Sequence, residues 1–213
     1  MNAHTQRLQM AGPAGALALA IDEPAQPPCG VAVVCHPHPL HGGTLDNKVA
    51  QTLARAFVQL GFRVVRFNFR GVGGSEGHWD EGRGEVDDAL AVIAAHRQAG
   101  QPLVLAGFSF GAYVASQAAH RLKDSPDAVE RLVLVGPATS NFDVAPVAAN
   151  TLVIHGEADE VVPLSATLAW ARPQVQPVVV VPGVGHFFHG QLTLLKHLVL
   201  RGWPYLVPPA PLT

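Results

Sequence analysis

Short apolar runs alternate along the chain with longer segments in which apolar residues recur at helical spacing. The runs predict buried strands at 31–35, 62–69, 103–108, 132–136, 151–156 and 177–181. The helical spacing predicts helices over 44–60, 80–99, 110–122 and 190–201. An edge hairpin is expected over residues 8–21. Strands without a polar face must be covered on both sides, so the alternation predicts the α/β class, with a mostly parallel sheet between layers of helices.

Composition narrows the class of protein. A chain of 213 residues with 48% hydrophobic and 14% charged residues is expected to form a single domain, 1–213, with a substantial core. The formal net charge is −2 and the charges are dispersed, which favours neither a nucleic-acid nor a membrane partner. No apolar run approaches the roughly 20 residues that cross a bilayer. We expect a monomer or a small homo-oligomer.

The two cysteines bear on the compartment. Cys29 and Cys35 flank one apolar run, and an extended strand would hold them too far apart to form a disulfide. Two reduced thiols predict a cytoplasmic protein. Residues 8–20 loosely mimic a signal peptide, but glycine and proline interrupt them and only Arg7 precedes them, so the hairpin is the preferred interpretation.

The pentapeptide Gly107-Phe108-Ser109-Phe110-Gly111 matches G-x-S-x-G at a predicted strand-to-helix junction. A sharp turn there exposes the serine hydroxyl in a strained conformation, and the glycines let strand and helix approach closely. The structural alternative is a glycine-rich turn with an incidental serine. The context favours Ser109 as a nucleophile.

A serine nucleophile needs a base, and the base needs an orienting carboxylate. Asp159 follows the strand at 151–156, and His186 follows the strand at 177–181. The order Ser, Asp, His is the one found on sheets of this type. We therefore predict a Ser109, Asp159 and His186 triad.

Other polar residues near strand ends compete for these roles. Glu157, Glu160 and Asp143 are alternative carboxylates. His155 ends a strand and is expected to be a packed structural residue, while His189 is expected to begin the last helix.

The stretch CHPHPLHGG, residues 35–43, invites a metal interpretation. His36, His38 and His41 have nearly the H-x-H-x-D-H spacing of binuclear zinc hydrolases. Leu40 stands where the aspartate would be, and the flanking prolines restrict convergence on one ion. We therefore expect no metal and no organic cofactor.

The same stretch suits an oxyanion hole, which needs two backbone donors. One is expected from Phe110, the residue after the nucleophile, where the helix dipole also favours negative charge. The other is expected from the loop after the early strand. Because Pro37 and Pro39 lack an N–H, the His38 amide is the predicted donor, with Leu40 in reserve.

Taken together, HPHPLHGGTLDNKV, RFNFRGVGGSEG and GFSFG resemble the α/β-hydrolase superfamily, in particular small bacterial serine hydrolases without a lid domain. The resemblance implies an eight-stranded sheet and carboxylesterase-type hydrolysis by the predicted triad. Only about fifteen residues, 136–150, separate the strands where a lid is usually inserted, too few for a helical cap. The glycine cluster at 70–77 fails the phosphate-loop patterns and is interpreted as a loop flanking the site.

An uncapped site favours small or short-chain esters. The side chains expected to line the pocket are Leu40, Trp79, Phe142 and Phe187. A thioesterase or small-peptide hydrolase would use the same triad. A non-catalytic binding protein on the same scaffold is the alternative from another class.

Overall fold

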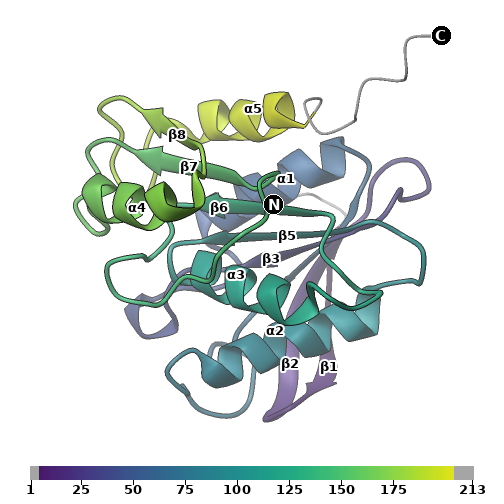
Figure 1. The fold of residues 1–213 in the computed structure, drawn as a ribbon. Coiled ribbons are helices and arrows are strands. Elements are labelled where there is room, and N and C mark those ends of the chain that lie inside the picture. The colour runs from purple at the N-terminus through teal and green to yellow at the C-terminus, as the bar shows by residue number, and fades with distance from the viewer. Residues whose placement is uncertain (1–4, 204–213) are drawn as a thin grey trace, which may run out of the picture.

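A computed structural model describes residues 5–203, which form an eight-stranded sheet in the order β1-β2-β4-β3-β5-β6-β7-β8 (Figure 1). The strands are β1 (Gln6–Gly12), β2 (Gly15–Asp22), β3 (Val31–Cys35), β4 (Arg63–Phe67), β5 (Leu103–Phe108), β6 (Arg131–Val135), β7 (Leu152–Gly156) and β8 (Val178–Val181). Only the β1–β2 and β2–β4 pairs are antiparallel; the other neighbouring strands are parallel. The predicted edge hairpin and the predicted eight-stranded, mostly parallel sheet are both confirmed.

Helices cover both faces of the sheet, as Figure 1 shows. They are α1 (Lys48–Gln59), α2 (Arg83–His96), α3 (Phe110–Leu122), α4 (Leu164–Ala171) and α5 (Leu192–Gly202). One apolar core lies between the sheet and α2 and α3, and the other lies between the sheet and α1 and α5. Over residues 5–203, no helix has the length and apolar character needed to cross a membrane.

The predicted starts of two helices are wrong. Helix α1 begins at Lys48 rather than at 44, because the Asn47 side chain accepts the N–H groups of Val49 and Ala50 and caps the helix there. Helix α2 begins after Glu81 and Gly82, whose positive φ angles exclude them from a right-handed helix.

Two helices after β7 also differ from the prediction. Helix α5 begins at Leu192, and His189 lies in the turn before it, because Gly190 adopts a φ of 74°. Helix α4 was not predicted. Its sequence LSATLAWA is apolar or small on every side, so it has no polar stripe to reveal a helical period. The proline-rich segment at 204–211 lies outside the described residues.

The junction of β5 and α3 depends on two glycines. A Cβ atom added to Gly107 would lie 2.0 Å from the Gly111 carbonyl oxygen, and one added to Gly111 would lie 2.2 Å from the Cys35 carbonyl oxygen. No side chain fits at either position. The prediction that these glycines let strand and helix approach closely is confirmed.

His36 links the ends of β3 and β4. Its side chain is fully buried, its Nδ1–H donates to the Pro37 carbonyl oxygen (2.6 Å), and its Nε2 accepts the Phe69 N–H (3.1 Å). The bond from the Phe69 N–H to His36 is one reason why β4 ends at Phe67 and not at 69. A single neutral tautomer satisfies both contacts. Burial lowers the pKa of His36 to about 4.

The glycine junction predicts the effect of one methyl group. Gly107→Ala should lower the free energy of unfolding by about 3 kcal/mol, the upper part of the range for overpacking, because the new Cβ meets rigid backbone. Gly74→Ala is the matched control, since a Cβ there makes only ordinary contacts at 3.5 Å. Urea denaturation of both variants measures the difference. Equal stability of the two variants would contradict the packing argument.

Buried neutral His36 predicts loss of stability in acid. Between pH 6.5 and about 4 the unfolded chain binds a proton at His36 that the folded chain does not, so stability is complete above pH 6.5 and falls as the pH falls. The difference in pKa corresponds to about 3 kcal/mol. Between pH 7 and pH 4.5, the free energy of unfolding should therefore fall by about 2–3 kcal/mol less in His36→Gln than in wild type, as measured by urea titration. The control His120→Gln, at an exposed position, should retain the wild-type dependence, and identical slopes in all three proteins would refute this account.

Candidate active site

Ser109 lies where β5 gives way to α3, and its backbone is strained. Its φ of 56° and ψ of −118° are unusual for a residue with a side chain. A conformation of this kind costs on the order of 1–3 kcal/mol and persists only where surrounding structure enforces it. The Ser109 N–H donates to the Val135 carbonyl oxygen (2.9 Å), which fixes the turn against β6. The predicted strained serine is thus confirmed.

Asp159 follows β7 and is held on both carboxylate oxygens. Its Oδ1 accepts the N–H groups of Val161 (2.9 Å) and Val162 (2.7 Å), and its Oδ2 accepts Nδ1–H of His186 (2.7 Å). Burial raises the pKa of Asp159, but the hydrogen bonds from His186 and the Val162 amide outweigh burial and hold the pKa below its usual value. The carboxylate is therefore ionised at neutral pH.

His186 follows β8 and packs against the end of β5, the strand that leads into the strained serine. Its ring packs on that of Phe108, the residue before Ser109, with ring centroids 4.8 Å apart. Because Nδ1 is bonded to Asp159, Nε2 is the nitrogen left to accept a proton. No hydrogen bond joins Ser109 Oγ to His186 in the described part of the chain; such bonds commonly tighten only when substrate binds.

The loops that carry Asp159 and His186 are bonded to each other. The Ala158 N–H donates to the Val184 carbonyl oxygen (3.0 Å), and a Cβ on Gly156 would lie 2.2 Å from that same oxygen. The two loops are therefore packed directly against each other. Their mutual support explains how two side chains from separate strands keep a 2.7 Å contact.

The competing polar residues take other positions. Glu157 accepts the Gly183 N–H (2.9 Å) at the surface, and Glu160 and Asp143 are exposed. His155 is fully buried and its Nε2–H donates to the Val162 carbonyl oxygen (2.9 Å), which confirms the packed role expected of it. Burial also lowers the pKa of His155 and keeps it neutral.

Residues 36–47, which we call the His38 loop, lie beside Ser109. Its amide at His38 and the amide of Phe110 donate no hydrogen bond to any group within residues 5–203. The Leu40 N–H, the reserve donor, instead donates to Nδ1 of His38 (3.2 Å). His38 and Phe110 are thus the two amides left free, and Leu40 is engaged.

The three histidines of this loop do not converge. His36 is buried in its bonds to Pro37 and Phe69, whereas the rings of His38 and His41 stack with centroids 4.4 Å apart. Among residues 5–203, no group of three or more His, Cys, Asp or Glu side chains is arranged to hold a metal ion.

A pocket of about 260 Å³ opens next to Ser109. It is lined by His38, His41, Ser109, Phe110, Ala138, Asn141, Phe142, Val161 and Val162. Sequence reasoning missed Ala138, Asn141 and the two valines as lining residues. Asn141 follows β6 and the valines follow Asp159, so their position after the carboxyl ends of strands was the signal that could have found them.

Of the side chains predicted to line the pocket, only Phe142 does so. Leu40 is 65% exposed outside it. Trp79 packs behind the pocket wall, against the rings of His38 (4.7 Å) and Phe110 (5.1 Å). Phe187 is exposed beside His186, with ring centroids 5.1 Å apart.

The glycine cluster at 70–77 also lies elsewhere than expected. Ser75 Oγ accepts the Ala18 N–H (2.9 Å), and Glu76 accepts the Ala16 N–H (2.7 Å). The cluster therefore packs on β2 and does not border this pocket.

Solved structures resemble the chain over nearly all of its length. A lid-less α/β serine hydrolase from Xanthomonas campestris has a TM-score of 0.85 and 38% identity, with 99% of each chain covered. An α/β serine hydrolase homologue from Coxiella burnetii has a TM-score of 0.81 and 40% identity, covering 93% of this chain and 97% of that one. Residues 136–151 contain no helix in this chain, so the segment forms no helical cap.

Curated sequences give shorter matches. A lysophosphatidylserine lipase from Danio rerio is 36% identical over 105 residues, which are 47% of this chain and 27% of the lipase. The chain spans less than two thirds of the length of the curated relatives that it matches. The family model described as "Serine aminopeptidase, S33" matches residues 26–149, more than half of the chain. The family match and the two similar structures agree with the fold and with the strained serine. The chain therefore belongs to the α/β-hydrolase superfamily, within the serine hydrolases that the S33 model describes.

Proposed function

We propose that the protein is a serine carboxylesterase that acts on small or short-chain esters. Ser109 is the nucleophile, His186 the base and Asp159 the carboxylate that orients it. The observation that carries the proposal is the 2.7 Å bond between Asp159 Oδ2 and His186 Nδ1, beside a serine held in a strained turn.

The reaction has two steps. Ser109 Oγ attacks the ester carbonyl carbon while His186 Nε2 takes the hydroxyl proton, and the same proton then goes to the leaving alcohol. Water, activated by His186, next attacks the acyl-enzyme and releases the acid. Ionised Asp159 stabilises the imidazolium in both steps, which its lowered pKa supports.

The tetrahedral intermediate carries a negative oxygen. The amides of His38 and Phe110 are the proposed donors to it, since both are free and both belong to residues that line the pocket with Ser109. Phe110 is also the first residue of α3, where the helix dipole favours negative charge. No metal or cofactor has a role in this scheme.

The pocket supports a small ester as the partner molecule. At about 260 Å³ it is smaller than the roughly 300–1,000 Å³ of most ligand pockets. Its walls are aromatic rings, aliphatic side chains, Asn141 and two imidazoles. Burial and the neighbouring His41 lower the pKa of His38, which keeps the His38 ring uncharged near neutral pH.

The S33 model favours aminopeptidase activity as a second candidate. An aminopeptidase must bind the charged amino group of its substrate, and carboxylates are the usual partners of such a group. None of the residues that line this pocket is Asp or Glu. The lining therefore supports uncharged esters over peptides with a free N-terminus.

The two unpaired cysteines support location in a reducing compartment. Exposed Cys29 and buried Cys35 are both free thiols. We therefore retain the cytoplasm as the proposed location.

Replacing the nucleophile tests the assignment directly. Ser109→Ala should lower kcat on p-nitrophenyl acetate by roughly 10⁴-fold or more and abolish labelling by a fluorophosphonate. Ser165→Ala, which removes an exposed hydroxyl on α4, is the matched control and should label as wild type does. If Ser109→Ala labels at the wild-type rate, the nucleophile is another residue.

A substrate panel separates the two candidate activities. We expect kcat/KM on p-nitrophenyl esters to be highest for two to four acyl carbons and to fall with longer chains, because the pocket is small. Matched thioesters and aminoacyl p-nitroanilides complete the panel. Faster hydrolysis of the anilides than of the esters would favour the aminopeptidase, and faster hydrolysis of the thioesters would favour a thioesterase.

A further inference from the structure

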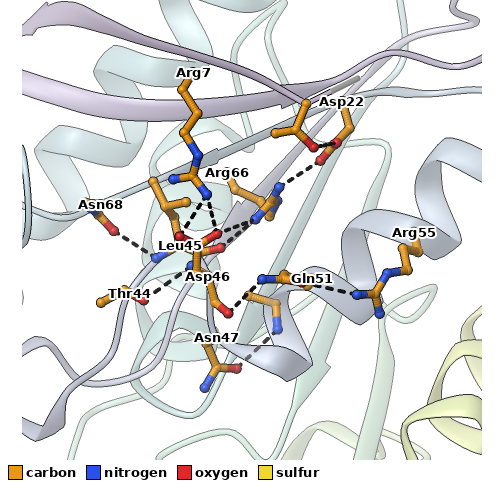
Figure 2. A network of polar contacts seen from close by, with 12 residues as sticks. Arg7, Asp22, Thr44, Leu45, Asp46, Asn47, Gln51, Arg55, Arg66 and Asn68 are labelled. Atoms are coloured by element: carbon orange, nitrogen blue, oxygen red, sulfur yellow. Dashed lines mark hydrogen bonds and ion pairs between the residues drawn. The ribbon is translucent and has the colours of Figure 1, made fainter. Parts of the chain in front are cut away.

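The His38 loop is tied to the sheet at both ends. At its start, buried His36 accepts the Phe69 N–H (3.1 Å). At its end, the Leu45 peptide groups are bonded on both sides: the N–H donates to Asn68 Oδ1 (2.8 Å), and the carbonyl oxygen accepts Arg66 Nη1–H (2.7 Å). Figure 2 shows Leu45 between these two side chains.

The Arg66 side chain is itself held in place by Asp22. Its Nη2–H donates to Asp22 Oδ2 on β2 (2.9 Å), and the two residues are only 2% and 4% exposed. A buried ion pair often adds little net stability over apolar residues of the same size, so stability alone does not account for this one. What it does provide is a guanidinium with a fixed direction, aimed at the Leu45 carbonyl oxygen.

The middle of the loop is compact enough to carry a displacement from Leu45 to His38. The His38 carbonyl oxygen accepts the N–H groups of His41 (3.1 Å) and Gly43 (3.0 Å). A Cβ on Gly43 would lie 2.1 Å from the Pro37 carbonyl oxygen, so the chain folds back on itself without slack. Prolines 37 and 39 restrict the remaining backbone freedom.

We propose that Arg66 and Asn68 are positioning residues that fix the His38 amide for the oxyanion through Leu45. The inference rests on the proposed function, which makes that amide an oxyanion donor. Neither residue lines the pocket beside Ser109. They set the place of the loop, and the loop sets the direction of the N–H.

The size of the expected effect follows from what an oxyanion donor contributes. Losing such a donor costs about 10²–10³ in kcat, and a donor that is loosened rather than lost should cost about tenfold. Because the donor acts on charge that develops in the transition state, kcat should fall while KM changes little.

Four variants separate positioning from general stability. Asn68→Ala removes the acceptor for the Leu45 N–H, whereas Asn68→Asp keeps one and should restore most of the activity. Arg66→Lys retains the charge opposite Asp22 but lacks the fork that also reaches Leu45. Arg55→Ala is the control, because within residues 5–203 exposed Arg55 bonds only to Gln51, at the edge of the same network (Figure 2).

The first measurement is kcat and KM on p-nitrophenyl acetate, with kcat expressed per active site titrated with fluorophosphonate. The second is the inhibition constant of phenylboronic acid, whose adduct with the serine places an oxygen in the oxyanion hole. Asn68→Ala and Arg66→Lys should lose about tenfold in kcat and in boronate affinity, with KM within about twofold. A purely structural role would reduce the number of titratable sites and leave both quantities per site unchanged, which would overturn the proposal.

Hydrogen–deuterium exchange of residues 36–45 gives a readout that does not need activity. Exchange should be faster in Asn68→Ala than in wild type and unaffected in Arg55→Ala. Equal exchange in all three proteins would refute the proposal that Asn68 holds the His38 loop in place. If wild type hydrolyses no ester, the proposed function fails, and the exchange result still decides whether Asn68 holds the loop.

Discussion

The backbone contact between Gly107 and Gly111 is the constraint on which the site depends. With 2.0 Å between a hypothetical Cβ at 107 and the Gly111 carbonyl oxygen, strand and helix can meet only if both positions lack side chains. That approach forces Ser109 into its strained turn and places the first amide of α3 beside the hydroxyl. The proposed nucleophile, Ser109, and one proposed oxyanion donor, Phe110, are therefore adjacent residues, and the rest of the fold must deliver the base, its carboxylate and the second donor.

The remaining groups arrive on loops that follow parallel strands, and each loop is stabilised by bonds to another. The Asp159 loop is bonded to the His186 loop through Ala158 and Val184, and the His38 loop is bonded to β4 and the residues after it. A site on loops is usually less rigid than one on strands. Here hydrogen bonds compensate: one joins the backbones of the two catalytic loops, and the others join the side chains of Arg66 and Asn68 to the His38 loop.

How much the sequence could predict depends on the range of the contacts involved. Helix α3 and strand β5 were predicted at both ends, because G-x-S-x-G marks the junction locally. Helix α1 was predicted to start too early because Leu45 continues its helical spacing of apolar residues. Leu45 in fact lies in a turn before the helix, where its N–H donates to Asn68, twenty-three positions away. Helix α4 lacks a polar face, and the pocket lining depends on how loops fold back; neither is visible in a local pattern.

The candidate triad was identifiable from order and position, but its electrostatics needed coordinates. Two histidines lie near Asp159, and His155 Nε2 is only 3.4 Å from the same oxygen that His186 bonds at 2.7 Å. His155 gives its Nε2–H to the Val162 carbonyl oxygen, and its Nδ1 is buried without a partner, so a proton taken up there would be desolvated. His186 instead has its Nδ1–H on the carboxylate and its other nitrogen uncommitted. Hydrogen bonding, more than distance to the acid, thus decides which imidazole can act as the base.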